Sequence, residues 1–309
     1  MRRGTNKTVL STFIVVFIAT FMLFNNCYST TYLDNLNKRQ IVPWGLKKIN
    51  ALSLGSEVTG KGVKVAIMDS GINKHPDFGY NIKEGYNAIN PNEPVFDDYG
   101  HGTLVSGVIV AQDNDFGIVG VAPDVELYPV KVLDEFGEGD ISDIAKGIDW
   151  CIENNIQVIN MSFAIEDDNA LLHEYVKKAF DSGIIIVASG SNTYGGDVGY
   201  PASYEQVISV AAVDKRLNIS KSSPKGKIDF SAPGVDVIST TNDGGYEEFT
   251  GTSIAAAYVT GIIALILEKP EKFGLTDKYS FNDVYLVLEK LSQNLGDRCL
   301  YGHGFISLK

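Results

Sequence analysis

The chain has 309 residues, of which 44% are hydrophobic and 31 are glycine, and its formal net charge is −12. This length and apolar content suit one large folded domain with a sizeable core, and they exclude a disordered or collagen-like chain. The excess of acidic residues argues against a nucleic-acid partner, because phosphate backbones are bound by basic surfaces.

The first 29 residues have the pattern of an export signal. A basic start with Arg2 and Arg3 precedes an apolar run at 9–24, which is shorter than the roughly 18 residues of a membrane-spanning helix. We therefore expect a secreted or extracellular protein. Three fates of the segment remain open, namely cleavage, retention as a membrane anchor, and lipidation at Cys27.

The chain is then divided into three parts. Residues 1–29 are the signal peptide or membrane anchor, residues 30–39 are a short linker or pro-segment, and residues 40–309 form one folded domain.

Short β-branched runs alternate with amphipathic segments from residue 62 onward. Strands are predicted at 63–68, 125–132, 158–161, 184–188 and 207–213. Helices are predicted at 103–112, 142–154, 170–182, 253–268 and 281–294. Runs such as GIIIVASG are apolar throughout, as expected of strands covered on both faces. The pattern predicts an α/β fold with a mainly parallel central sheet flanked by helices, and an active site at the carboxyl ends of the strands.

Two candidate catalytic residues occur early in this pattern. Asp69 ends the strand VKVAIMD, and His101 lies between two glycines at the start of a predicted helix. An aspartate in this place can simply close a turn, and a lone histidine can be structural. The glycines beside His101, however, let the backbone approach a ligand closely. These two residues can supply a general base and its orienting carboxylate.

Two further candidates lie later in the chain. Ser253 opens a predicted helix, where a serine is either an N-cap or a nucleophile close to the favourable field of the helix N-terminus. Asn192 follows the buried strand VAS, where it either forms a turn or donates its amide to a developing oxyanion. The order Asp, His, Ser is that of the subtilisin type of serine hydrolase.

Over residues 40–307 the chain resembles the subtilisin family of serine endopeptidases. The matching stretches are QIVPWG, VAIMDSGI, HPDF, GHGTLVSG, FGIVGVAP, YPVKVL, VINMSF, GYPASY, SAPG, GTSIA and YGHGFISL. The resemblance implies a subtilisin-like three-layer sandwich and a monomeric enzyme that cleaves protein or peptide substrates through an acyl-enzyme. It makes Asp69 the residue that orients the imidazole, His101 the general base and acid, Ser253 the nucleophile and Asn192 an oxyanion donor.

The chain departs from the family pattern beside these residues. Ile254 replaces the methionine that usually follows the serine, which removes an oxidisable thioether and should raise peroxide tolerance. Ser191 replaces the glycine that normally precedes the asparagine, and its side chain should narrow the substrate cleft.

The resemblance also assigns the peptide-binding residues. One wall of the primary specificity pocket is Ser162, Phe163 and Ala164, and the other is Ser189, Gly190, Ser191 and Gly199. Ala164 replaces a glycine, so we expect a mostly apolar pocket that is shallower than usual. The backbone of Gly137 and Gly139 should pair with an extended peptide, and Ile141 and Ile144 should line an outer apolar subsite.

Four side chains have roles that the sequence leaves open. Asp97 and Asp98 either favour a basic substrate residue or are solvated carboxylates of a turn. Cys151 and Cys299 either form a disulfide or remain free, and we expect two buried free thiols.

A structural Ca²⁺ site is also implied by the resemblance. Its ligands are the side chains of Gln40, Asp77 and Asn114 and the backbone carbonyls of Gln112, Phe116 and Ile118. Such an all-oxygen set suits a hard cation and not zinc. The alternative is an ordinary acidic surface loop.

Two other classes of protein are weighed against an active peptidase. A catalytically inactive subtilisin-like regulatory or binding module would keep the same fold. A nucleotide-binding α/β protein is suggested by the glycines of DSGINKHPDFG, but the chain has neither GxGxxG nor GxxxxGK[ST].

Overall fold

The computed structural model describes residues 39–308. The predicted signal or anchor at 1–29, with Cys27, and residues 30–38 of the predicted linker lie outside the described residues. Within the described part of the chain, no helix combines the length and apolar composition that crossing a membrane requires.

A nine-stranded sheet runs through the centre of the molecule in the order β10-β11-β7-β6-β5-β4-β1-β3-β2. Its strands are β1 (Lys64–Asp69), β2 (Tyr86–Asn87), β3 (Glu126–Lys131), β4 (Val158–Met161), β5 (Ile185–Ser189), β6 (Val207–Val213), β7 (Phe230–Pro233), β10 (Ser292–Gln293) and β11 (Phe305–Ile306). Neighbouring strands are parallel except for β10 and β11. A separate antiparallel pair is formed by β8 (Val237–Thr240) and β9 (Tyr246–Phe249).

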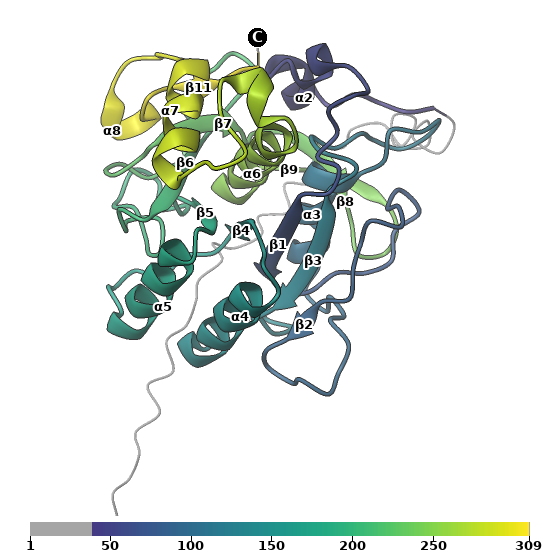
Figure 1. Cartoon of the computed structure of the whole chain (residues 1–309), viewed down its shortest axis with the longest axis vertical. Helices are drawn as coiled ribbons and strands as arrows, with labels where there is room; N and C mark the ends of the chain where they lie inside the picture. The colour runs from purple at the N-terminus through teal and green to yellow at the C-terminus, as the bar shows by residue number, and fades with distance from the viewer. Residues whose placement is uncertain (1–38, 309) are drawn as a thin grey trace, which may run out of the picture.

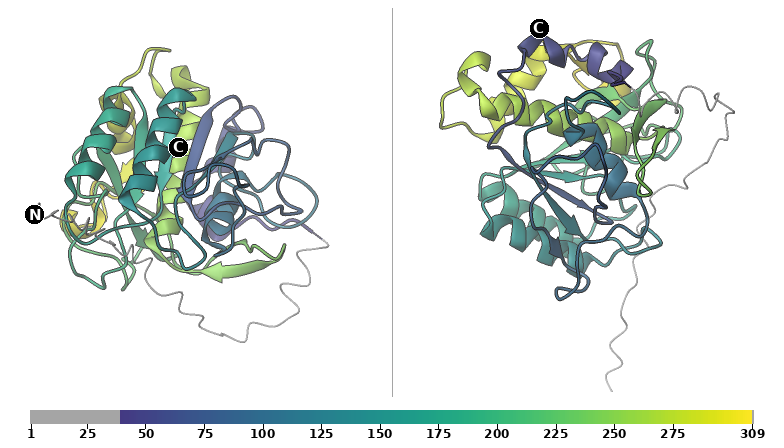
Figure 2. Two further views of the ribbon diagram at one scale, coloured as in Figure 1. Left: turned by 90° about the horizontal axis from the view of Figure 1, so that it is seen from below. Right: turned by 90° about the vertical axis from the view of Figure 1, so that its right-hand side faces the viewer.

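Helices cover both faces of this sheet, which gives the expected three-layer α/β architecture (Figures 1 and 2). The helices are α2 (Trp44–Lys48), α3 (His101–Val110), α4 (Ile141–Glu153), α5 (Ala170–Asp181), α6 (Thr252–Glu268), α7 (Phe281–Leu291) and α8 (Arg298–Tyr301), with short 3₁₀ turns η1 (Ala51–Leu54) and η2 (Pro270–Phe273). Helices α4 and α5 pack on one face, and α3 and α6 pack on the other.

Strand β1 shows why the buried strands lack an alternating pattern. Val65 and Ile67 belong to the core beneath α3 and α6, whereas Ala66 and Met68 belong to the core beneath α4 and α5. Because successive side chains of a strand point to opposite faces, a strand between two helical layers must be apolar at every position.

The strands and helices expected from the sequence are confirmed, with ends that differ by a few residues. The largest difference is in α7, expected to reach residue 294, which ends at Leu291. The backbone of Ser292 is extended instead, and the strand β10 that it begins pairs with β11. A long-range strand pair therefore ends a helix that local propensity would continue.

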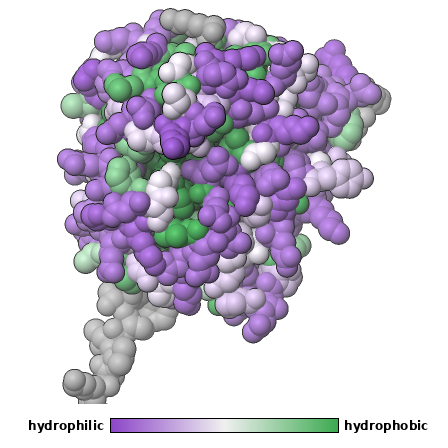
Figure 3. All heavy atoms as spheres, viewed as in Figure 1, coloured by the Kyte–Doolittle hydropathy of each residue, from purple (hydrophilic) through white to green (hydrophobic). Residues whose placement is uncertain are grey.

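On the face shown in Figure 3, hydrophilic side chains cover most of the surface, and hydrophobic ones are visible mainly in recesses between them.

Candidate active site

The candidate residues gather at the carboxyl edge of three adjacent strands, β5, β4 and β1. Asp69 is the last residue of β1, Ser162 directly follows β4, and Asn192 lies in the turn that follows β5. The chain passes from β1 to β3 on one side and then to β4 on the other side of β1. Such a change of direction in a parallel sheet opens a crevice at the carboxyl ends of the strands, where ligands bind.

Asp69 and His101 are in direct contact. The Nδ1 atom of His101 lies 2.9 Å from both carboxylate oxygens of Asp69, and the backbone N–H of Ser70 donates to Asp69 Oδ1 at 2.8 Å. Both side chains are buried. A carboxylate only accepts hydrogen bonds, so Nδ1 carries the hydrogen and Nε2 is left as the basic nitrogen of the neutral ring.

The surroundings of His101 tune its basicity in opposite directions. Burial alone would lower the pKa of His101, but the Asp69 carboxylate, with a smaller contribution from Asp97, outweighs burial and raises this pKa above its usual value. The imidazole is therefore a somewhat stronger base than a free histidine.

Ser253 is the second residue of α6, and Gly251 is the N-cap. The Ser253 hydroxyl donates to the carbonyl of Ser162 at 3.0 Å, so the interpretation of Ser253 as an N-cap is wrong. Helices α3 and α6 pack against each other, and His101 and Ser253 lie in the first turns of these two helices. Among the described hydrogen bonds there is none between the Ser253 hydroxyl and His101.

Buried polar side chains connect α6 to β4, and two of them, Asn160 and Thr260, were not among the candidates from the sequence. Thr260 donates to Asn160 Oδ1 at 3.0 Å, and Asn160 donates to Ser162 Oγ at 2.8 Å. Ser162 Oγ in turn donates to the backbone carbonyl of Ser253 at 3.2 Å. The signal in the sequence was the polar Asn160 inside the apolar strand VINM, since a buried amide must find partners.

Asn192 is anchored to the same helix start. The backbone N–H of Thr252 donates to Asn192 Oδ1 at 3.1 Å, and the Thr252 hydroxyl donates to the carbonyl of Ser191 at 3.0 Å. The side-chain oxygen of Asn192 is thus occupied, which leaves its NH₂ group as the donor that faces the turn before Ser253.

Ser191, in contrast, is strained. Its φ is 90°, in the region that favours glycine, and its Oγ is buried without a hydrogen-bond partner in the described structure. Position 191 therefore has a side chain although its backbone conformation favours glycine.

The residues predicted to form the two walls of the specificity pocket are brought together. The N–H of Gly199 donates to the carbonyl of Gly190 at 3.2 Å. A Cβ placed on Gly199 would lie 2.8 Å from the Cβ of Ala164 and 3.6 Å from that of Ser191. The side chains of Ala164 and Ser191 therefore flank Gly199 and narrow the space between the walls, and Phe163 is buried behind them.

The predicted peptide-pairing segment forms a tight loop. Gly137 has a φ of 76°, and a Cβ there would approach the Tyr99 ring to 2.9 Å. A Cβ at Gly139 would lie 2.4 Å from the carbonyl of Val132, so both positions need glycine. Ile141 is buried with 8% of its surface exposed. Ile144 is fully buried in the core, so the expectation that it lines an outer subsite is wrong.

The structure excludes a substrate-binding role for Asp97. This carboxylate is fully buried and accepts four hydrogen bonds from within the chain. Asp98 is exposed, and its carboxylate lies 3.3 Å from the ammonium of Lys131.

The predicted calcium ligands also lie together. Gln40 Nε2 is 2.7 Å from the carbonyl of Gln112 and 3.3 Å from that of Ile118. Asn114 donates to Asp77 Oδ1 at 3.0 Å, and Phe116 donates its N–H to Asn114 Oδ1 at 2.9 Å. The N–H of Ile118 donates to Asp77 Oδ2 at 2.8 Å, which joins all six predicted residues in one cluster.

The donor set of this cluster fits a hard cation. Burial raises the pKa of Asp77, although hydrogen bonds from the N–H of Ile118, from Asn114 and from Tyr246 act against it. Turning the Gln40 amide would exchange its nitrogen for its oxygen beside the same carbonyls, so that these oxygens could bind one cation together. Within residues 39–308 there is no group of three or more His, Cys, Asp and Glu that could hold a metal, and this cluster differs in kind because it contains a single carboxylate.

Both described cysteines are free, as expected. Cys151 is buried, and burial raises the pKa of its thiol, which keeps it protonated and unreactive. Cys299 is exposed, so the expectation that it is buried is wrong.

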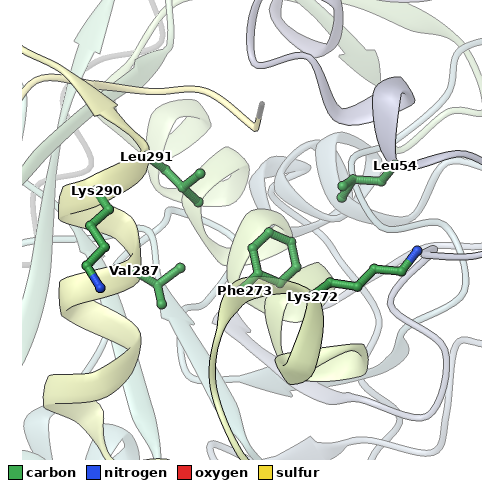
Figure 4. A pocket seen from close by; sticks show the side chains of 6 residues that line it. All are labelled: Leu54, Lys272, Phe273, Val287, Lys290 and Leu291. Atoms are coloured by element: carbon green, nitrogen blue, oxygen red, sulfur yellow. The ribbon is translucent and has the colours of Figure 1, made fainter.

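A hollow of about 410 Å³ lies away from these residues, between η1, η2 and α7 (Figure 4). It is lined by Leu54, Lys272, Phe273, Val287, Lys290 and Leu291. None of the candidate catalytic or metal-binding residues contributes to it.

Comparisons with known proteins agree with this architecture. The sequence model of the Subtilase family matches residues 60–304. The chain is 38% identical to alkaline elastase YaB of Bacillus sp. (strain YaB), over 87% of this chain and 69% of that protein. It is 38% identical to subtilisin Savinase of Lederbergia lenta over 87% of this chain and 97% of that protein. The same identity holds with a thermostable alkaline protease of Halalkalibacterium halodurans, over 86% of this chain and 72% of that protein.

Proposed function

Because this chain belongs to the subtilase family and is a serine endopeptidase, we propose that Asp69, His101 and Ser253 are its catalytic triad. The observation that carries this assignment is the contact of His101 Nδ1 with both oxygens of Asp69 at 2.9 Å. It leaves Nε2 as the base at the carboxyl edge of the sheet, where α6 presents Ser253.

The geometry supports the following sequence of steps. Proton transfer to His101 requires the Ser253 hydroxyl to turn away from the Ser162 carbonyl by rotation about the Cα–Cβ bond. Oγ then attacks the scissile carbonyl carbon while its proton passes to Nε2 of His101, and Asp69 stabilises the resulting imidazolium. The imidazolium gives the proton to the leaving amine, the C–N bond breaks, and a water activated in the same way hydrolyses the acyl-enzyme.

Asn192 and the backbone N–H of Ser253 bind the oxyanion in this proposal. The anchoring of Asn192 Oδ1 by Thr252 supports the role, because it fixes the amide before the reaction begins. The N-terminus of α6 adds a field that favours negative charge at the same place.

The substrate is a protein or peptide bound in extended form along Gly137 and Gly139, with Ile141 at an outer subsite. The residue before the scissile bond enters the pocket between the two walls. These walls are formed by Ser162, Phe163 and Ala164 on one side and by Ser189, Gly190 and Gly199 on the other. The side chains that flank Gly199 favour small apolar residues there.

The cluster around Asp77 binds one structural Ca²⁺, with Gln40, Gln112, Asn114, Phe116 and Ile118 as the other ligands. The cation supplies positive charge to a buried carboxylate and joins the segment at Gln40 to the loop at 112–118. It takes no part in peptide hydrolysis.

The enzyme acts outside the cell. The basic start and the apolar run at 9–24 support export. A comparison of the mature N-terminus with the sequence distinguishes cleavage from retention of this segment.

The decisive experiment is labelling with a serine-directed fluorophosphonate. The wild-type chain should be labelled and lose its peptidase activity, and the Ser253→Ala variant should be neither labelled nor active. Equal labelling of both proteins would assign the nucleophile to another serine, whereas a wild-type protein without labelling or activity would favour a binding module of the same fold.

A further inference from the structure

A second buried carboxylate lies beside the triad. Asp97 is fully buried. Its Oδ1 accepts hydrogen bonds from the Ser70 hydroxyl at 2.7 Å and from the N–H of Gly100 at 2.7 Å. Its Oδ2 accepts from the N–H of Thr103 at 2.7 Å and from the Thr103 hydroxyl at 2.6 Å. Four short bonds of this kind are typical of an ionised carboxylate.

The donors to Asp97 belong to the two segments that carry the acid–base pair. Ser70 directly follows Asp69, and Gly100 and Thr103 lie on either side of His101. The Ser70 hydroxyl also accepts the N–H of Gly102 at 3.0 Å. Through Ser70, the Asp97 carboxylate joins the turn after β1 to the first turn of α3.

Asp97 also replaces a missing helix cap. The N-cap of α3 is Gly100, with a φ of 99° and no side chain to accept the free N–H groups of the first turn. Asp97 accepts one of these N–H groups, that of Thr103, from an earlier position in the chain, and its charge suits a helix N-terminus. Gly100 can therefore precede His101 without leaving the N-terminus of α3 uncapped.

Resting on the triad proposed above, we propose that Asp97 is a positioning residue of the peptidase. It holds Asp69 and His101 in one rigid unit and places a second negative charge beside the imidazole that becomes protonated during the reaction.

The charges around His101 agree with this role. Asp69 contacts the ring, Asp97 lies beneath the first turn of α3, and the Tyr99 ring centroid is 6.5 Å from that of His101. A cation also contacts this turn, since Lys131 donates to the carbonyl of Ser70 at 2.7 Å and pairs with Asp98. Both Asp69 and Asp97 raise the pKa of His101 against its burial, and they stabilise the imidazolium where charge develops.

The test is Asp97→Asn, which keeps the shape and removes the charge. We expect kcat to fall about tenfold or more with KM changed by less than about threefold, since the loss lies in the transition state. The acidic limb of the kcat/KM profile should move down by roughly half a pH unit, because a protonated His101 loses one favourable charge. Asp149→Asn, which makes the same charge change on α4 at a partly exposed carboxylate paired with Lys178, should leave both quantities unchanged.

Ser70→Ala separates positioning from charge. It removes the hydroxyl that lies 2.7 Å from Asp97 Oδ1 and 3.3 Å from Asp69 Oδ1, and it leaves both carboxylates. We expect a loss of kcat with the acidic limb in place. If Asp97→Asn does not fold, Ser70→Ala decides the positioning role, and wild-type kcat in that variant overturns it. A folded Asp97→Asn that behaves like Asp149→Asn, or one that loses activity with an unmoved acidic limb, also overturns the proposal. Activity in Ser253→Ala would instead overturn the triad itself.

Discussion

Asp69 and Asp77 are both fully buried carboxylates of the same half of the chain, yet their partners differ in kind. Asp69 contacts the ring of His101, a group that can carry positive charge. Among residues 39–308, the Asp77 carboxylate receives hydrogen bonds only from neutral donors, namely the amide of Asn114, the N–H of Ile118 and the hydroxyl of Tyr246.

The difference agrees with the two roles proposed above, because only Asp69 has a partner in the chain that can become positively charged. Neutral donors do not fully replace the water that burial removes, and the pKa of Asp77 is raised accordingly. A partner such as His101 can balance the charge of Asp69 as the reaction proceeds. Two carboxylates of equal burial are therefore proposed to have different roles, catalytic for Asp69 and metal-binding for Asp77.

The same substitution at both positions gives the largest expected effect. Asp69→Asn should lower kcat by roughly 10³- to 10⁴-fold. The amide NH₂ can donate to Nδ1 and so favour the tautomer with its hydrogen on Nε2, which cannot act as the base, and a neutral amide no longer stabilises the imidazolium. Asp77→Asn should leave kcat within about threefold, provided that it is assayed below its melting temperature. Steady-state kinetics of both variants measure this, and equal losses would contradict the division of roles.

Removal of the Ca²⁺ proposed to bind at Asp77 tests the other half of the comparison. Chelation of Ca²⁺ should lower the melting temperature by about 5–10 °C, as expected when a ligand at about a hundred times its Kd stabilises the folded state by about 2.7 kcal/mol. Autolysis should rise as well. Asp77→Ala should melt at the same temperature with EDTA and with excess calcium. If the wild-type curves in EDTA and in calcium superimpose, the calcium site is absent.

A substitution at Ser191, in a wall of the specificity pocket, should have a smaller effect on stability. Ser191→Gly should raise the free energy of unfolding by about 1 kcal/mol or more. The substitution removes the cost of a side chain at positive φ, about 1–2 kcal/mol, and the cost of a buried unpaired hydroxyl, about 1–3 kcal/mol. The greater freedom of glycine in the unfolded chain opposes this gain by about 0.5–1 kcal/mol. Chemical denaturation measures the change. The wider pocket should also accept larger residues before the scissile bond, and a less stable variant would show that the strain is relieved in another way.

A pH profile sharpens the description of the Asp69–His101 pair. The ring must be neutral to accept the proton of Ser253, and the pKa of His101 is raised, so kcat/KM should rise with pH through a midpoint above the usual value of about 6.5. Initial rates between roughly pH 5 and 9 measure it. A flat profile, or a midpoint below the usual value, would count against His101 as the base.

The smallest expected effect is that of peroxide. Ile254 is buried beside Ser253, and the described methionines, Met68 and Met161, are fully buried. Brief treatment with peroxide should therefore leave most of the activity. A Cys299→Ser variant controls for oxidation of the exposed thiol, and rapid inactivation of that variant would show that another group near the site is oxidised.

The sequence was sufficient for the parts of the site that depend on local pattern. Asp69 at the end of a buried strand and His101 at the start of a helix could be placed at the carboxyl edge of a parallel sheet before any contact was known. The roles of Asp97 and Asn160 could not be predicted, because their partners, among them Ser70 and Thr260, are distant in the chain. Neither could the contact of the Ser253 hydroxyl with the Ser162 carbonyl, which depends on a side-chain rotamer.

By itself, then, the sequence determined the alternation of strands and helices, the two-sided burial of the sheet and the order of the candidate triad. These follow from periodicity and from residue types that act over a few neighbouring positions. Tertiary structure alone decided which carboxylates are buried, that α7 gives way to β10, and that Asp97 joins the turn of Asp69 to the helix of His101. The physical reason is that burial and hydrogen bonding depend on the packing of distant segments, and only the folded chain fixes how those segments meet.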